Sequence, residues 1–197
     1  MPNEIKIIAS VIATGIALVA YLPYLRDMFK GKNKPHLYAW ISIFIITAVV
    51  AYLQFIGGAG IGAIPTAIGV LIDAIILFYC FRFGTKDIIF MDKICLAISI
   101  IGVIAYIVFR STPSISLAIV LIAEVISFIP TFRKTMNDPY SEYLPTYYML
   151  IVKLTLILIA LQQYNFLTAF YSVMWIIVFL IFLPAVYIRR FQVKTAK

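Results

Sequence analysis

Seven long apolar segments, separated by short polar breaks, limit what this chain can fold into more than any other feature. A helix that crosses a bilayer needs about 20 largely apolar residues, whereas the strands of a membrane barrel give weaker, alternating segments of about ten. The runs here are continuous and rich in Ile, Leu, Val and Phe, so they predict helices. We therefore expect an all-α, polytopic membrane protein with seven transmembrane helices at residues 5–25, 36–56, 61–83, 94–109, 113–132, 143–161 and 166–188.

The composition agrees with this interpretation. Of the 197 residues, 64% are apolar or aromatic and 12% are charged, whereas soluble domains are about half apolar and a quarter charged. This excludes an ordinary cytosolic enzyme, a disordered chain and a disulfide scaffold. One histidine and two cysteines, without a CxxC motif, offer no metal-ligand cluster. No Ser-His-Asp set or phosphate loop stands out, so we expect neither a cofactor nor an enzymatic activity.

The basic residues are sorted between the two sides of the predicted bundle. Of the 16 Lys and Arg residues, 13 fall in the breaks at 26–35, 82–93 and 133–142 or at the C-terminal end, two fall on the opposite side, and Lys153 lies within the sixth segment. Cytoplasmic loops accumulate Lys and Arg, so the N-terminus is predicted to lie outside and the C-terminus in the cytoplasm. The net charge of +8 is thus topological, and it predicts a lipid bilayer rather than nucleic acid as the partner. We expect a bacterial or archaeal plasma membrane.

A short motif occurs twice along the chain. Residues 20–26 read Ala-Tyr-Leu-Pro-Tyr-Leu-Arg and residues 127–133 read Ser-Phe-Ile-Pro-Thr-Phe-Arg, at an offset of 107, so that Pro23 matches Pro130. Each motif closes a predicted helix and precedes two more. Two three-helix units joined directly would be inverted, and one additional helix between them restores a parallel orientation. The expected organisation is one compact membrane domain with a first three-helix bundle at 1–83, a linker helix at 84–110 and a second bundle at 111–197.

This order of three, one and three helices, with a proline near the cytoplasmic end of the first helix of each half, resembles the SWEET and PQ-loop superfamily. The resemblance covers nearly the whole chain, through the architecture and two Pro-x-x-Arg motifs. In the family a glutamine usually follows each of these prolines. This chain differs, because Tyr24 follows Pro23 and Thr131 follows Pro130. The family's prolines inside helices two and six and its paired asparagine and tryptophan are not evident. Aligning Gly69 with the family's third-helix glycine places Thr66 at the asparagine position and Asp73 at that of an acidic residue.

Three charged residues, Asp73, Glu124 and Lys153, lie deep within predicted helices. With a rise of about 1.5 Å per residue, each would sit about 15 Å below the surface, near the bilayer midplane. A charge that faces lipid there costs about 2.5–3.5 kcal/mol, so we expect all three to face the interior. Glu124 and Lys153 lie at similar depth on adjacent antiparallel helices, and we predict that they pair. This pair is either a structural salt bridge or a site that orients substrate or couples an ion.

Other residues also have two interpretations. Asp73, which has no obvious partner, is either a proton or cation site or a protonated packing residue. Pro23 and Pro130 each remove a backbone hydrogen bond, and they form either a hinge pair at the cytoplasmic gate or static kinks. Trp175 in the last helix either stacks on a sugar ring or packs in the core. Several tyrosines are interpreted as an interfacial belt, among them Tyr21, Tyr147, Tyr148 and Tyr187.

The resemblance implies a transporter in which two bundles rock around a central cavity and give a small polar metabolite, in the first instance a sugar, alternating access. A cationic amino acid or a vitamin is the alternative substrate, because acidic residues lie at the midplane. A non-transporting receptor or assembly factor on the same fold is a third interpretation. A homo-oligomer that forms through the lipid-facing surfaces of the helices is compatible with all three interpretations. The candidate residues for binding or coupling are Asp73, Glu124, Lys153, Thr66 and Trp175.

Overall fold

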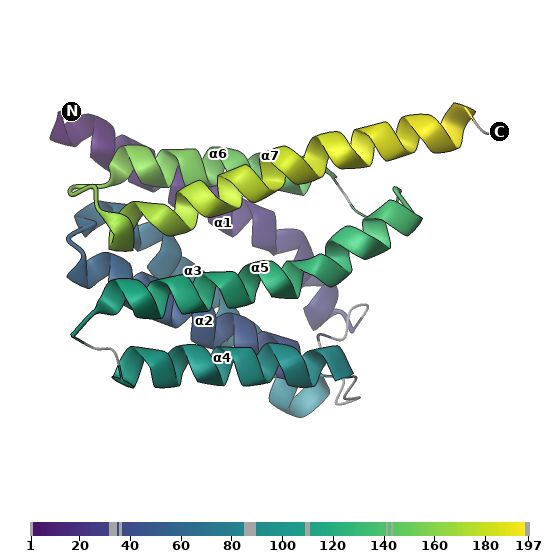
Figure 1. The fold of residues 1–197 in the computed structure, drawn as a ribbon. Coiled ribbons are helices and arrows are strands. Elements are labelled where there is room, and N and C mark those ends of the chain that lie inside the picture. Colours follow the sequence, from purple (N-terminus) through teal and green to yellow (C-terminus); the bar gives the residue numbers. More distant parts are fainter. Residues whose placement is uncertain are drawn as a thin grey trace.

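The computed structural model describes residues 2–31, 35, 37–84, 90–108, 111–140, 142 and 144–195. These residues form an all-α fold of seven α-helices and one short 3₁₀ helix (Figure 1). The elements are α1 (Asn3–Phe29), α2 (Leu37–Ile56), η1 (Gly60–Ala63), α3 (Ile64–Phe83), α4 (Phe90–Val108), α5 (Pro113–Asn137), α6 (Leu144–Ala160) and α7 (Phe166–Thr195). The predicted number and order of helices are confirmed.

Three helices run further than predicted at their C-terminal ends, and α4 begins at Phe90 rather than at residue 94. α1 continues to Phe29, α5 to Asn137 and α7 to Thr195. The prediction stopped where the side chains become polar, but a helix that leaves the apolar layer keeps its backbone hydrogen bonds in water. Pro23 and Pro184 lie inside α1 and α7, because a proline removes one hydrogen bond and bends a helix without having to end it. The predicted boundaries at 36, 109 and 143 lie outside the described residues.

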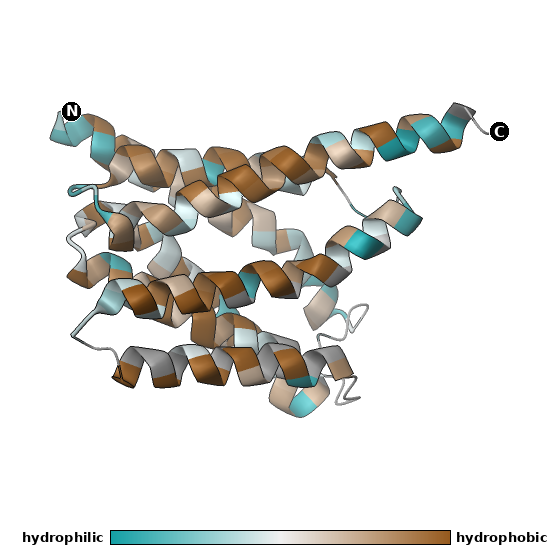
Figure 2. Ribbon diagram, viewed as in Figure 1, coloured by the Kyte–Doolittle hydropathy of each residue, from teal (hydrophilic) through white to brown (hydrophobic). Residues whose placement is uncertain are grey.

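The outer surface and the helix lengths identify an integral membrane protein. Large apolar side chains face outward, and Phe78, Val11 and Leu22 are 82%, 65% and 59% exposed. A surface of this kind suits lipid rather than water. Figure 2 shows hydrophobic residues along the helices and hydrophilic residues gathered toward the helix ends near both termini. Among the residues that the structure describes, four segments are long and apolar enough to cross a membrane, namely Asn3–Phe29, Gly60–Phe83, Pro113–Asn137 and Phe166–Lys194.

Successive helices run in opposite directions, so the N- and C-termini lie at opposite ends of the bundle (Figure 1). The C-terminal turns of α1 and α3 meet at one end, where the Tyr79 hydroxyl donates to the Met28 carbonyl at 2.8 Å. The C-terminal turns of α5 and α7 meet at the same end, where Arg189 Nε donates to the Met136 carbonyl at 3.0 Å. We call this the basic end, because it carries Arg26, Lys30, Arg82, Arg133, Arg189, Arg190 and Lys194.

The order in which the helices pack is the same in the first three and the last three. In the first set, α3 packs against both α1 and α2, and in the second set, α7 packs against both α5 and α6. α4 lies against α2 and α5, and α1 lies along α6. The chain therefore closes a ring in which α1 and α6 form the seam between the two sets.

The buried face of α1 at this seam carries small side chains. Ala13 packs in one cluster with Ile157 and Leu161 of α6 and its following loop. Residues three or four positions apart share a face of a helix. The buried residues in this part of α1 have that spacing, and they are Ala9, Ser10, Ala13 and Ala17.

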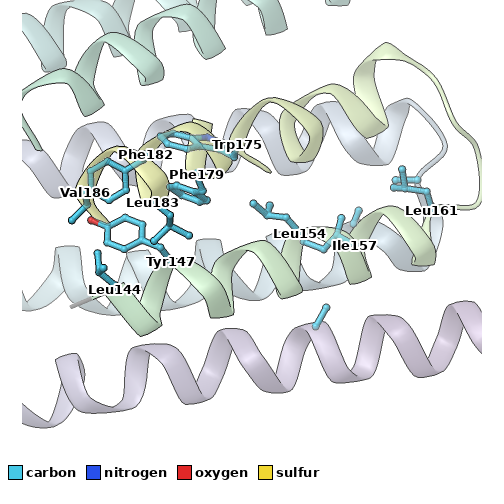
Figure 3. Packing of buried hydrophobic residues seen from close by; sticks show 13 residues of the cluster. Leu144, Tyr147, Leu154, Ile157, Leu161, Trp175, Phe179, Phe182, Leu183 and Val186 are labelled. Atoms are coloured by element: carbon cyan, nitrogen blue, oxygen red, sulfur yellow. The ribbon is translucent and has the colours of Figure 1, made fainter. Parts of the chain in front are cut away.

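The same core cluster has an aromatic centre on α6 and α7, against which Phe128 of α5 packs (Figure 3). Phe128, Tyr147 and Phe182 lie with ring centroids 4.8 to 6.4 Å apart, the separation at which aromatic pairs attract. Tyr147, predicted as part of an interfacial belt, has a buried ring, and its hydroxyl donates to Glu142 Oε2 in the loop before α6 at 3.0 Å. Tyr148, one position along α6, is exposed.

Candidate functional site

A small polar cavity lies where the two sets of three helices meet. Its volume is about 60 Å³, and its walls come from α1, α2, α3, α6 and α7. We call it the central cavity. Its polar wall is made by Tyr21, Thr47, Thr66, Asp73, Lys153 and Tyr171.

α3 brings Thr66 and Asp73 to the cavity on one face. Thr66, Gly69 and Asp73 are separated by three and four residues, so they share one side of the helix. Gly69 has no side chain, and a Cβ placed there would meet only the Thr47 methyl group, at 3.8 Å. Asp73 is 1% exposed, and its Oδ1 atom has no hydrogen-bond partner. A buried carboxylate oxygen without a partner is energetically unfavourable unless a cation or donor reaches it.

Lys153 enters the same cavity from α6. The predicted pair between Glu124 and Lys153 is wrong, because no salt bridge joins Lys153 to either carboxylate in the described part of the chain. Lys153 interacts electrostatically with Asp73 and, more weakly, with Glu124. Glu124 instead points toward α7, where Trp175 donates a hydrogen bond to it. A basic and an acidic side chain therefore face one enclosed space from opposite sides of the seam.

Glu124 has a different partner. Its Oε2 atom accepts a hydrogen bond from Trp175 Nε1 at 3.1 Å. The Trp175 ring packs against Phe128 and Phe179, with centroids 5.5 and 5.1 Å away, and it is not among the residues that line the central cavity. Tyr171 lies between the central cavity and the Glu124–Trp175 pair, since it lines the cavity and interacts electrostatically with both Glu124 and Asp73. The five candidate residues thus form a cavity group and a neighbouring Glu124–Trp175 group.

A larger cavity of about 620 Å³ lies between α1 and α6 toward the basic end. We call it the vestibule. Pro23 and Asp27 line it, and so does Trp40 of α2, whose Nε1 atom donates to the Tyr24 hydroxyl at 3.0 Å. Tyr21 lines both the vestibule and the central cavity, so this side chain stands between them. The prediction that Tyr21 belongs to an interfacial belt is wrong.

The opposite end of the bundle is closed by two loops. Gln162 N donates to the Ala59 carbonyl at 3.0 Å, and Gln163 N donates to the Gly58 carbonyl at 3.2 Å. Asn165 Nδ2 donates to the carbonyl of residue 57 at 2.6 Å. Gly60 has a φ of +57°, and a Cβ there would overlap the side chain of Gln162. We call these loops, 57–60 and 161–165, the loop seal.

The side chain of Pro130 lies outside the described residues, although position 130 lies within α5. Sequence reasoning missed Tyr171, Thr47 and the gating position of Tyr21. The signal for Tyr171 was its place among three hydroxyl-bearing residues, Thr168, Tyr171 and Ser172, near the start of α7.

The arrangement is suited to binding a small polar ligand. The described residues hold no group of three or more His, Cys, Asp or Glu side chains that could bind a metal ion. The vestibule lies toward the basic end, and the two hydrogen-bonded loops of the loop seal lie at the opposite end. Comparison of the chain with protein-family models, with curated proteins and with solved structures gives no match.

Proposed function

We propose that this protein is a membrane transporter that moves a small polar metabolite through the central cavity by alternating access. The observation that carries the proposal is that buried Asp73 and half-buried Lys153 line one cavity at the seam between two sets of three helices. Ionisable residues inside a membrane protein are costly, and they mark substrate and ion pathways. A purely structural role would favour a direct salt bridge, which neither residue makes among the described residues.

The repeated packing order supports the same proposal. We propose that all seven helices cross the membrane, as a first bundle at 1–83, a linker helix at 84–110 and a second bundle at 111–197. Parallel repeats of this kind carry transport sites at the interface of the repeats. The order of packing, with the third helix of each set between the other two, is what a SWEET-type or PQ-loop fold would need. The basic end would then face the cytoplasm of a bacterial or archaeal cell.

In this proposal, Pro23 and Pro130 act as hinges near the cytoplasmic gate. Pro23 lines the vestibule, so a change of bend there would alter the width of the vestibule directly. Both positions lie in the part of their helix that approaches the basic end. The pair would therefore widen or narrow access from one side only.

The class of substrate rests on two different arguments. The resemblance favours a sugar, whereas the charges in the cavity favour a charged metabolite such as an amino acid. The Trp175 ring packs in the aromatic core, so a sugar-stacking role for it would need a rearrangement. The partners are thus one small solute and the lipid bilayer. A homo-oligomer is compatible with the exposed apolar surface.

Uptake into proteoliposomes tests the proposal. The full chain, reconstituted and supplied with a labelled panel of sugars, amino acids and vitamins, is expected to move at least one solute down its gradient. Asp73→Asn should abolish most of this uptake, and any residual uptake should lose its pH dependence if Asp73 takes up a proton during transport. Asp138→Asn, at an exposed loop position, is the matched control. Saturable binding without any uptake would instead show a receptor.

A further inference from the structure

We propose that the central cavity binds the head group of a small amino acid, with its ammonium group at Asp73 and its carboxylate at Lys153. This inference rests on the proposed function, because it takes the central cavity as the substrate site. It starts from a carboxylate and an ammonium group that face one space without a salt bridge between them, the carboxylate being held by Thr47 on one side only. Asp73 is 1% exposed with an unpartnered Oδ1 atom, and Lys153 lines the same cavity without a salt bridge to any described residue.

The two charges select the chemistry of the ligand. A neutral sugar would bring no charge of its own, so Asp73 and Lys153 would keep only their attraction across the cavity, without a direct ionic contact in a low-dielectric interior. A simple cation would satisfy Asp73 alone, and a simple anion would satisfy Lys153 alone. A zwitterion satisfies both residues through charge-assisted hydrogen bonds and adds no net charge to the site.

The size of the cavity limits the rest of the ligand. A volume of about 60 Å³ holds roughly two to four water molecules. An occupant of this arrangement is therefore no larger than glycine or alanine. The hydroxyl groups of Thr66 and Tyr171 are the remaining polar groups near the head group, and the small residues Ala17 and Gly69 leave the room for a methyl side chain.

Thermal unfolding of the purified full chain in detergent provides the first test. The ligands are glycine, L-alanine, ethylamine, propionate and glucose, each titrated to the same concentrations. A ligand that binds only the folded state raises the Tm by mass action. Glycine or alanine is expected to raise the Tm, whereas ethylamine and propionate, which each lose one charged contact, should bind about tenfold to a hundredfold more weakly. Stabilisation by glucose at concentrations where alanine has no effect would overturn the inference.

Charge variants then assign the two ends of the ligand. In Asp73→Asn, alanine should lose its advantage over propionate, and in Lys153→Met it should lose its advantage over ethylamine. The double variant Asp73→Lys with Lys153→Asp should bind alanine again, in the reversed orientation. Equal weakening of all ligands in each single variant would contradict the assignment. Asp138→Asn and Lys93→Met, both at exposed positions, are the matched controls.

Binding and transport can fail separately in these experiments. If alanine stabilises the protein but proteoliposomes take up no solute, the transporter proposal is wrong and the amino-acid site stands. If proteoliposomes take up glucose but not alanine, the transporter proposal stands and the amino-acid site is wrong. The ligand panel on the unmodified chain remains decisive even if a charge variant does not fold.

Discussion

The two ends of the bundle are closed in different ways. At the loop seal, three hydrogen bonds join residues 57–59 to residues 162–165, and all three acceptors are backbone carbonyls. At the basic end, α1 and α6 enclose a vestibule, and the side chain of Tyr21 separates it from the central cavity. Opening the first end requires several hydrogen bonds to break together, whereas opening the second requires one side chain to rotate. The two ends therefore differ in what would have to move before a solute could enter from either side.

Gly60→Val is expected to have the largest effect, because it attacks the loop seal at its most constrained position. A β-branched residue at a φ of +57° is strained by about 1–2 kcal/mol, and the exposed Gln162 side chain must move aside to make room for it. Thermal unfolding should show the loss of stability, and thiol labelling of a Gln163→Cys reporter should increase.

Gly15→Ala is the control for that substitution. A Cβ at this helical position meets nothing within 4 Å, so the variant should be equally stable or more stable by about 0.5–1 kcal/mol. If Gly60→Val unfolds at the same temperature as the unmodified chain, the loop seal is not a constrained structure.

Tyr21→Ala should open the other end without breaking any backbone hydrogen bond. Removal of the ring is expected to merge the vestibule with the central cavity, because Tyr21 lines both. A Thr66→Cys reporter in the cavity should then react several-fold faster with a thiol reagent applied from the basic end. Tyr21→Phe keeps the ring and should leave the labelling rate unchanged. Equal rates in the Ala and Phe variants would show that Tyr21 does not separate the two spaces.

Asn165→Asp separates two roles of one side chain. Asn165 Oδ1 accepts hydrogen bonds from the backbone N–H groups of Leu167 and Thr168 at the start of α7, while its amide group donates to the carbonyl of residue 57. An aspartate keeps the helix cap but loses the donor, so about 1 kcal/mol of stability should be lost. Chemical denaturation measures this difference. Asn165→Ala, which loses both roles, should be less stable than Asn165→Asp, and the reverse order would remove Asn165 from the loop seal.

Pro23→Ala should have the smallest effect on stability and a clear effect on uptake. The alanine restores a backbone hydrogen bond in α1 and stiffens the wall of the vestibule. Uptake in proteoliposomes should fall while the unfolding temperature changes little. Pro184→Ala is the matched control, because Pro184 also lies inside a helix but does not line the vestibule. A similar change in uptake for both variants would assign Pro23 a static role.

The positions of the helices were predictable from the sequence because hydropathy reports depth in the membrane. Asp73 and Lys153 were expected to lie deep and to face inward, and both line the central cavity. The partner of Glu124 was not predictable, because depth does not fix the rotation of a helix about its axis. Glu124 is turned toward Trp175, and Lys153 toward the seam of α1 and α6.

The misplaced tyrosines show the same limit. A tyrosine has an apolar ring and a polar tip, so it suits both a membrane interface and a buried polar site. Tyr148 and Tyr187 are exposed, with hydroxyl groups 3.2 Å apart, whereas Tyr21 lines two cavities and Tyr147 packs in the core. Only the contacts with neighbouring helices distinguish these environments.

The small side chains of α1 have a mechanical consequence for the seam. Where two helices pack through long interdigitated side chains, the helices can move past each other only if those side chains first separate. Ala9, Ala13 and Ala17 offer no such obstacle, so α1 can slide or tilt over α6 at little steric cost. The contact between α1 and α6 also carries Lys153. A tilt of α1 against α6 would therefore change the width of the central cavity directly.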